Sequence, residues 1–225
     1  MSQGVGEQRE NPHWPQGLVQ AVRVELDDHS PSDAREKRAK TRILKSLNRL
    51  PRPFDEEADL VHVTGSAVVV GRRGTVLHLH KRLHRWMQPG GHIEPNEAPW
   101  HAALRESEEE TGLTLSHPRG RPRLIHVDVH EAAKGHTHLD FRYLLMATDE
   151  DPAPLPGESP EARWYRWDEA LAVADDALVG ALRVAKAQPE VAATLGVDPV
   201  RSGVDPVRAR VDPDLNADHA AEEGR

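Results

Sequence analysis

Residues 90–113 of the chain read GGHIEPNEAPWHAALRESEEETGL, and this stretch decides the fold. Counted from Gly91, Glu97 follows after five residues and an Arg-Glu pair after seven more. A Glu-Glu pair follows after two further residues, and a glycine and a leucine close the stretch. An acidic helix does not usually carry glycines at fixed offsets, so the spacing indicates a functional site.

Residues 98–111 are predicted to form a helix, because they are rich in Ala, Leu and Glu and have Pro99 in the first turn. Glu109 and Glu110 follow Glu106 by three and four residues, so the three carboxylates project from about one helix face. Exposed like charges at this spacing repel by roughly 0.2–0.5 kcal/mol per pair. A hard cation such as Mg²⁺ turns this cost into a binding site, because it prefers oxygen ligands.

The residues that flank this helix suit a backbone that approaches a ligand closely. Gly90 and Gly91 have no side chains to keep a metal or a phosphate away. Asn96 tolerates a left-handed turn before the helix, and Gly112 is expected to cap its C-terminus. The alternative is a solvated acidic helix that ends at a glycine by chance.

At these residues the chain resembles the Nudix (MutT-like) hydrolase family. The family's box is G-x5-E-x7-R-E-U-x-E-E-x-G-U, where U is a bulky apolar residue. The sequence departs from it at Ser107, which stands where a bulky apolar residue is expected. That position is expected to face the core, so the departure bears on helix packing more than on chemistry. The surrounding strand pattern extends the resemblance to about residues 61–167.

The resemblance implies hydrolysis of a pyrophosphate bond in a nucleoside diphosphate linked to another group, with Mg²⁺ or Mn²⁺ as cofactor. The implied metal-holding positions are the Gly90 carbonyl, Glu97, Glu106, Glu109 and Glu110. The implied catalytic residues are Glu106, Glu109, Glu110 and Glu158. Arg105 is expected to orient the box carboxylates by ion pairing, and Gly91 and Gly112 to shape the backbone around them.

Glu158 enters this set because Nudix hydrolases often use one more glutamate, from a loop before a late strand. Glu158 lies in such a loop, six residues before Trp164. Glu161 is the less favoured candidate for the same role. The alternative for both residues is an ordinary acid in a surface loop.

Composition sets the outer limits of the interpretation. The 225 residues include no cysteine, which fits a cytoplasmic location and excludes a cysteine nucleophile. No apolar run approaches the ~18 residues of a membrane span, and the N-terminus lacks the features of a signal peptide. The net charge of −8 makes a small nucleotide-type substrate the expected partner and a nucleic acid an unexpected one. The sequence leaves the oligomeric state open, a homodimer included.

Four segments divide the chain. We expect a flexible N-terminus over 1–16, a helical extension over 17–55, the Nudix domain over 56–196 and a disordered tail over 197–225. The tail repeats VDPVRSG, VDPVRAR and VDPDLNA, and heptads that each carry a proline and lack an apolar face cannot bury a core.

Hydrophobic periodicity predicts the remaining elements. Helices are expected over 17–28, from an N-cap at residues 32–33 to about 50, over 169–174 capped by Asp168, and over 177–187 capped by Asp176. Strands are expected over 61–70, 75–80, a short segment at 85–86, 123–130, 137–147 and 162–167. Strands on both sides of a central helix suit an α/β/α sandwich on a mixed sheet.

Two histidine- and aspartate-containing trios stand out in the strands predicted over 123–130 and 137–147. The trios are His126, Asp128 and His130, and His136, His138 and Asp140. Spacing by two places each trio on one strand face, and hairpin pairing would bring the trios together. We interpret them as a polar wall of the substrate cleft or an extra transition-metal site, against the alternative of a solvent-facing sheet surface. The predicted substrate-binding residues are Arg85, Trp86, His126, Asp128, His138 and Asp140; His78, His80 and His92 are weaker candidates.

Residues 34–49 hold seven Lys or Arg residues and one acid. Such a run is more often a solvated helix face than a binding surface for RNA or an acidic partner. It nevertheless supports one competing interpretation, a catalytically weak Nudix-fold module that senses a ligand through this basic surface. Another Nudix-fold activity, isomerisation of isopentenyl diphosphate, brings a catalytic cysteine that this chain lacks.

Overall fold

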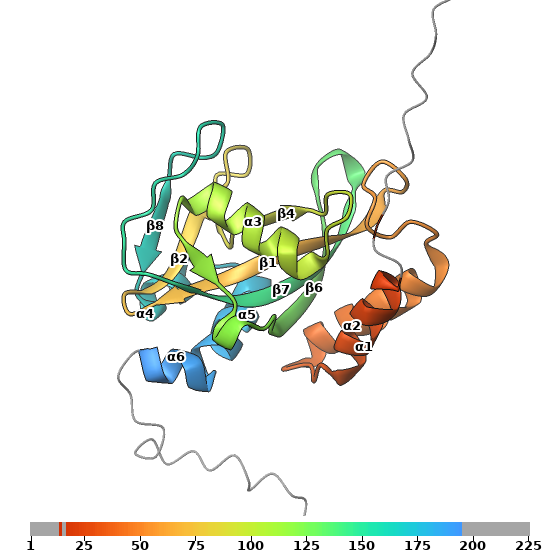
Figure 1. The fold of residues 1–225 in the computed structure, drawn as a ribbon, viewed down its shortest axis with the longest axis horizontal. Coiled ribbons are helices and arrows are strands. Elements are labelled where there is room, and N and C mark those ends of the chain that lie inside the picture. The colour runs from red at the N-terminus through yellow and green to blue at the C-terminus, as the bar shows by residue number, and fades with distance from the viewer. Residues whose placement is uncertain (1–13, 15–16, 195–225) are drawn as a thin grey trace, which may run out of the picture.

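Two long parallel strands, β1 (Val61–Gly71) and β7 (Thr137–Ala147), form the centre of the sheet in a computed structural model of the chain (Figure 1). The structure describes Trp14 and residues 17–194. The predicted flexible N-terminus, apart from Trp14, and the predicted tail lie outside these residues. Among residues 17–194, no helix combines the length and apolar character that crossing a membrane requires.

The other strands extend the sheet on both sides. The strand order β3-β2-β1-β7-β5 is joined by β4 on β1, β6 on β7 and β8 on β2. Apart from the parallel β1–β7 pair, the strand pairs are antiparallel, so the sheet is mixed as predicted. The bounds are β2 Gly74–Leu79, β3 Trp86–Met87, β4 Gly90–His92, β5 Leu115–Ser116, β6 Leu124–Glu131 and β8 Ala162–Tyr165. Both predicted hairpins, β1–β2 and β6–β7, are confirmed; the short strands β4 and β5 were not predicted.

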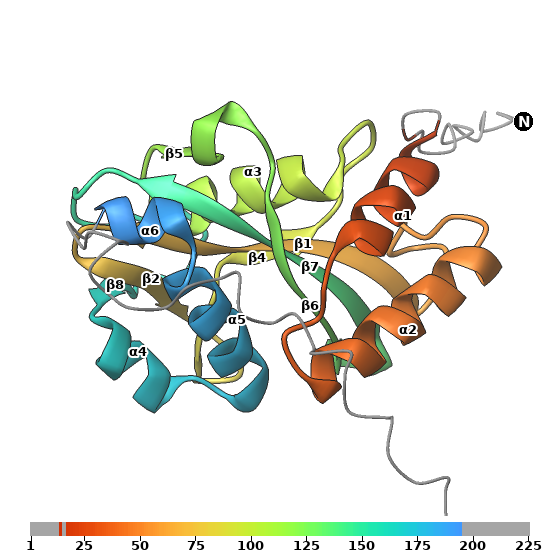
Figure 2. The ribbon, with the colours of Figure 1, turned by 90° about the horizontal axis from the view of Figure 1, so that it is seen from below.

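Helices cover both faces of the sheet (Figure 2). Alternate residues of β1 point to opposite faces: Val69 packs into one core with α1, α2 and α3, whereas Val68 packs into a second core with α4, α5 and α6. The helices are α1 Leu18–Asp28, α2 Ala34–Arg49, α3 Pro99–Thr111, α4 Trp167–Val173, α5 Asp176–Lys186 and α6 Pro189–Thr194. The predicted α/β/α sandwich is confirmed.

The predicted helix starts after residue 160 are each wrong. The N-cap of α4 is Arg166, two residues before the predicted Asp168, because the buried Trp167 brings the helix start forward and the Glu169 carboxylate accepts from the Arg166 amide (3.0 Å). The N-cap of α5 is Asp175, whose side chain accepts from the Leu178 amide (2.9 Å). Helix α6, which starts at a proline, was not predicted.

Glu36 attaches α2 to the sheet. Its fully buried carboxylate accepts hydrogen bonds from the Val127 amide of β6 (3.0 Å) and from His29 Nε2 (2.6 Å). It also accepts from the amide and the hydroxyl of Ser32 (2.6 and 2.8 Å). Burial acts to raise the pKa of Glu36, but the bond from His29, the nearby His126 and the bonds from Ser32 lower it to about 2.

This attachment should be lost in acid. Since the native pKa of about 2 lies below the ordinary 4.5, the native state holds this proton less readily than the unfolded state. The contribution of Glu36 is therefore complete above about pH 4.5 and disappears as the pH falls to about 2. We expect the difference in unfolding free energy between the wild type and Glu36→Gln to shrink across this window in denaturant titrations. A difference that stays constant with pH would contradict the assignment.

Candidate active site

Helix α3 and the loop before it have the predicted geometry. The helix runs from Pro99 to Thr111 and is capped by Gly112, which adopts φ 66°. Asn96 is also left-handed, with φ 67°. Ser107 is fully buried, as its place in the box implies, and its hydroxyl has no hydrogen-bond partner among the described residues. The box therefore folds as expected, with the cost of one unpaired hydroxyl where an apolar side chain would leave none.

Arg105 ties the box carboxylates together, as predicted from ion pairing. Its guanidinium binds both oxygens of Glu97 (3.0 and 2.9 Å) and one oxygen each of Glu106 (2.9 Å) and Glu109 (3.3 Å). Burial acts to lower the pKa of Arg105, but the hydrogen bonds that it donates to Glu97 and Glu106 raise it overall, so the residue stays charged. Both oxygens of Glu97 accept from Arg105, and its implied role as a metal ligand stays a prediction.

The carboxylate of Glu110 is the most enclosed of the box. Its side chain is 12 % exposed, and one oxygen accepts the Gly90 amide (2.8 Å). The other oxygen lies 3.3 Å from Nδ1 of the buried His78. Burial, with the charges of Glu106, Glu158 and Glu109, raises the pKa of Glu110 to about 8 despite the Gly90 bond. The pKa of His78 is lowered to about 4 by burial and by His80, so at neutral pH these two groups do not form an ion pair.

Glu106 shares this environment. Burial raises its pKa, Arg105 opposes the shift, and the charges of Glu109 and Glu158 add to it. The charge of Glu158 thus contributes to the raised pKa of both Glu106 and Glu110, whereas the charge of Glu161 contributes to that of Tyr165. The catalytic role of either loop acid stays a prediction.

The donor set fits a hard divalent cation. Glu106, Glu109, Glu110 and Glu158 bring negative charge together, and Arg105 pairs with the first two of them. A carboxylate whose pKa is raised by burial and by like charges is stabilised by a bound cation. The contact of Gly90 with the box is made through its amide, and ligation through its carbonyl stays a prediction.

Gly91 holds Glu106 in place through its lack of a side chain. A Cβ at this position would lie 2.4 Å from Cδ and 2.5 Å from Oε1 of Glu106. Gly91→Ala should therefore displace the Glu106 carboxylate, and a displacement of about 1 Å can cost on the order of 10²-fold in rate. Because the clash is with the end of a flexible side chain, the melting temperature should change little. Unchanged kcat in Gly91→Ala, or loss of the fold, would contradict this account.

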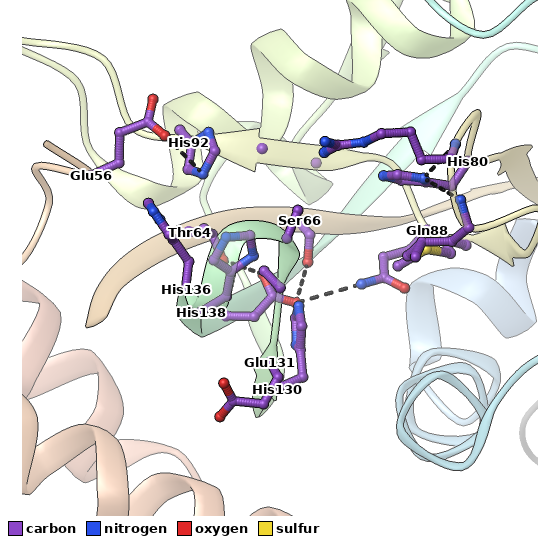
Figure 3. Close-up of a pocket in the computed structure, with 18 of the residues that line it drawn as sticks. Glu56, Thr64, Ser66, His80, Gln88, His92, His130, Glu131, His136 and His138 are labelled. Carbon is purple, nitrogen blue, oxygen red and sulfur yellow. Dashed lines mark hydrogen bonds and ion pairs between the residues drawn. The ribbon is translucent and has the colours of Figure 1, made fainter. Parts of the chain in front are cut away.

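A cleft of about 440 Å³ opens beside the box (Figure 3). Small-molecule sites typically occupy ~300–1,000 Å³, so the cleft could hold most of a nucleotide. Thr64 and Ser66 of β1 and Asp140 of β7 lie at its base. The side toward the box is formed by Gly90, Gly91 and Glu110. At another end the lining consists of Glu56, His92, His130, His136 and His138.

The histidine and aspartate trios pair across the β6–β7 hairpin as predicted. Asp128 lies opposite Asp140, and His130 lies opposite His138. The solvent-facing alternative is wrong for the centre of this surface, because Asp128 and Asp140 are each 2 % exposed. His126 is also buried, and its ring lies near α5, where a Cβ on Gly180 would come within 3.0 Å of it.

A buried arginine explains why the two aspartates can face each other. Arg142 binds Asp140 (2.9 Å) and Asp128 (3.4 Å), and donates to the Ala177 carbonyl of α5 (2.9 Å). Asp140 also accepts from the hydroxyls of Thr64 (3.0 Å) and Ser66 (2.8 Å). These bonds occupy the aspartates, so they organise the base of the cleft.

Four of the six predicted substrate-binding residues lie outside the cleft lining. His138 and Asp140 line it, but His126 and Asp128 do not. Arg85 is exposed, and Trp86 packs edge-on against Tyr165 (ring centroids 5.2 Å apart). Their sequence neighbours Arg82, Leu83, Met87 and Gln88 line the cleft in their place.

Sequence reasoning missed two cations and two hydroxyls of the cleft. Arg82 and Lys134 are exposed cationic side chains in its lining, where they can bind phosphate. No pattern distinguishes them in the sequence. Thr64 and Ser66 did carry a signal, because they alternate, together with His62, within a mostly apolar strand.

The basic helix divides into structural and exposed residues. Arg35 pairs with Asp128 (3.1 Å), and Lys40 donates to the carbonyls of Asp27 and His29 at the end of α1. The outer side of the helix presents Lys37, Arg38, Arg42 and Lys45. Most of the positive charge is therefore a solvated face, the more common outcome for such a run.

Comparison with known proteins gives a family match. A model of the NUDIX domain matches residues 57–185, more than half of the chain. The chain is 30 % identical to a NUDIX-family hydrolase from Clostridium perfringens of known structure, covering 56 % of this chain and 96 % of that chain with a TM-score of 0.48.

Curated relatives include two proteins matched over most of their length. The asymmetrical bis(5′-nucleosyl)-tetraphosphatase of Caenorhabditis elegans is 33 % identical over 103 residues, which are 44 % of this chain and 71 % of the relative. A probable DHNTP pyrophosphohydrolase of Lactococcus lactis subsp. cremoris is 31 % identical over 122 residues, 48 % of this chain and 73 % of the relative.

Proposed function

Since this chain belongs to the Nudix hydrolase family and is a pyrophosphohydrolase by that membership, we propose that it cleaves a pyrophosphate bond in a nucleoside diphosphate linked to another group, in a reaction that requires Mg²⁺ or Mn²⁺. The observation that carries the proposal is the cluster of Glu106, Glu109 and Glu110 beside the cleft, with the pKa of Glu110 raised to about 8 by burial and neighbouring charge. Such a cluster is stable in its charged form when a cation is bound.

Glu106, Glu109 and Glu110 would hold the cation. When bound, Mg²⁺ or Mn²⁺ supplies positive charge that stabilises the negative charge developing on phosphate oxygens. Arg105 keeps Glu106 and Glu109 in place, and the Gly90 amide keeps Glu110 in place. Fixed groups of this kind need no reorganisation during the reaction.

The cleft would bind the substrate next to these carboxylates. Arg82 and Lys134 provide positive charge for its phosphates, and the histidines provide flat surfaces and polar atoms for the rest of the molecule. Water attacks one phosphorus, the bridging P–O bond breaks, and each product leaves with a terminal phosphate.

We propose that Glu158 is the general base that accepts the proton of the attacking water. The assignment is supported by the charge of Glu158, which contributes to the raised pKa of both Glu106 and Glu110. The amide of Glu158 donates to the Leu155 carbonyl (3.0 Å), which fixes the backbone of this loop, and a carboxylate held there can accept a proton from water.

A substrate panel tests the proposal. Purified full-length chain is assayed with bis(5′-nucleosyl) tetraphosphates, nucleotide sugars, oxidised nucleotides and RNA 5′ ends, with Mg²⁺, with Mn²⁺ and with a chelator. Phosphate is measured with and without added phosphatase, which separates cleavage inside a phosphate chain from release of terminal phosphate. We expect cation-dependent cleavage of at least one class. Cleavage that persists in chelator would contradict the cation requirement. A panel in which compounds bind without turnover would favour the ligand-sensing module instead.

A further inference from the structure

Histidines from three strands meet at the end of the cleft that Glu56 borders. His62 of β1 lies 5.2 Å from His92 of β4 and 5.1 Å from His138 of β7, measured between ring centroids. His92 and His138 are themselves 5.2 Å apart. Figure 3 shows His92, His136 and His138 at one end of the cleft, with Glu56 beside His92. These rings do not hold the carboxylates of the Nudix box, so the proposed hydrolysis does not account for them.

His62 is oriented as a metal ligand would be. Its Nδ1 lies 3.2 Å from the Asp59 carbonyl, and because a carbonyl can only accept, Nδ1 carries the proton. The lone pair is therefore on Nε2. Metal-binding histidines are usually fixed in this way, by donating the other ring N–H to a carbonyl or a carboxylate.

The Nε2 atom of His62 has no hydrogen-bond partner within the part of the chain that the structure describes. The residue is completely buried, and Nε2 forms no hydrogen bond among the described residues. An unpaired buried acceptor costs roughly 1–3 kcal/mol. A cation at this position would satisfy it.

We propose that His62, His92 and His138 form a binding site for a transition metal of the zinc class, separate from the carboxylate site of the Nudix box. One ligand atom from each of the three histidines lies within 4.8 Å of the other two. In tetrahedral zinc with bonds of ~2.0–2.1 Å, the nitrogen ligands lie roughly 3.3 Å apart. Ring rotations that move the ligand nitrogens by about 1 Å would therefore complete the site.

The ligand chemistry selects the metal. Neutral imidazoles suit Zn²⁺, Co²⁺, Ni²⁺ and Cu²⁺, whereas Mg²⁺ requires oxygen ligands. Burial lowers the pKa values of His62, His92 and His138, which favours the neutral form that binds these metals. Three protein ligands leave a fourth position, and since His92 and His138 line the cleft, that position faces the substrate space.

A second set of ligands overlaps the first. Glu56, His62 and His136 also bring their ligand atoms within 4.8 Å of one another. Because His62 belongs to both sets and offers a single ligand atom, the two sets cannot each hold an ion at the same time. We favour His62, His92 and His138 because all three lie on strands of the sheet, while Glu56 lies in a loop with its side chain 46 % exposed.

The test is titration of the full-length chain with Zn²⁺ and Co²⁺ in excess Mg²⁺, which competes for the carboxylate site. We expect one equivalent of Zn²⁺ to bind by calorimetry. Co²⁺ should give the visible absorption of a four- or five-coordinate imidazole complex, which an octahedral carboxylate and water complex gives only weakly. Removing a residue that holds a metal ligand in place typically weakens metal binding by ~10–100-fold. His92→Gln and His138→Gln remove a ligand itself, so each should lower the affinity for Zn²⁺ by at least ~100-fold.

Matched variants give the controls. His84→Gln changes an exposed histidine, and His136→Gln and Glu56→Gln change the competing set; all three should bind Zn²⁺ as the wild type does. Thermal melting of each variant in Mg²⁺ verifies the fold. The proposal is overturned if the wild type gives no Co²⁺ spectrum of this type. It is also overturned if folded His92→Gln and His138→Gln bind normally, or if Glu109→Gln abolishes binding in their place. Hydrolysis is not measured, so the result is independent of the proposed function.

Discussion

Glu110→Gln should lower kcat by about 10²–10³-fold, the scale of deleting a fixed stabilising group. The substitution keeps the size of the side chain and lets its carbonyl accept the Gly90 amide, but removes the negative charge that a hard cation requires. Glu109→Gln should have an effect of the same kind. The measurement is the steady-state rate on any accepted substrate at saturating Mg²⁺.

Glu108→Gln is the matched control on the same helix. Glu108 points away from the face shared by Glu106 and Glu110, and one of its oxygens accepts the Leu115 amide (3.1 Å). A glutamine keeps that acceptor, so kcat should be nearly unchanged. A loss in Glu108→Gln equal to that in Glu110→Gln would show that any change to the helix disables the enzyme.

Glu110→Gln should not destabilise the metal-free protein. The pKa of Glu110 is raised to about 8 from 4.5 by burial and neighbouring charge, so the native state holds this proton more readily than the unfolded state. Its contribution to stability therefore falls as the pH rises from about 4.5 to about 8. We expect Glu110→Gln to be as stable as the wild type or more so at pH 8 in chelator. A lower melting temperature there would contradict the electrostatic account of the site.

Arg142→Met should lower the unfolding free energy by about 3–5 kcal/mol, the usual result of removing one partner from a buried charge network. Arg142 is 3 % exposed and stands between Asp128 and Asp140, so its loss leaves two buried carboxylates facing each other. Denaturant titration measures the change.

Arg35→Met is the control for this network. Arg35 binds the same Asp128, but its side chain is 44 % exposed, and ion pairs open to solvent contribute roughly 0–1 kcal/mol. Equal losses in Arg35→Met and Arg142→Met would show that burial does not decide the effect.

The box was predictable because its information is local. A helix with a fixed offset between Glu106 and Glu110, a glycine at each end and a proline in the first turn specifies its own geometry. The predicted capping by Gly112 and the buried position of Ser107 are confirmed for the same reason. The metal-binding and catalytic roles of the carboxylates stay predictions.

The cleft was less predictable because it depends on tertiary contacts. Alternating His and Asp residues around Asp128 and Asp140 indicated a polar face on each strand. Nothing in the sequence showed that Arg142 would bind both carboxylates. His62 alternates with Thr64 and Ser66, but it meets His92 and His138 only when β1, β4 and β7 assemble. Short strands such as β4 are likewise determined by pairing with β1 more than by local preference.

The most direct test of the central claim is the Mg²⁺ dependence of hydrolysis in the wild type, Glu108→Gln, Glu109→Gln and Glu110→Gln, measured side by side on one substrate. If the carboxylates of Glu109 and Glu110 hold the catalytic cation, their glutamine variants should need a higher Mg²⁺ concentration for half-maximal rate, in addition to a lower maximum. Glu108→Gln should follow the wild-type curve. Wild-type turnover and an unshifted Mg²⁺ curve in both Glu109→Gln and Glu110→Gln would contradict the assignment of this site.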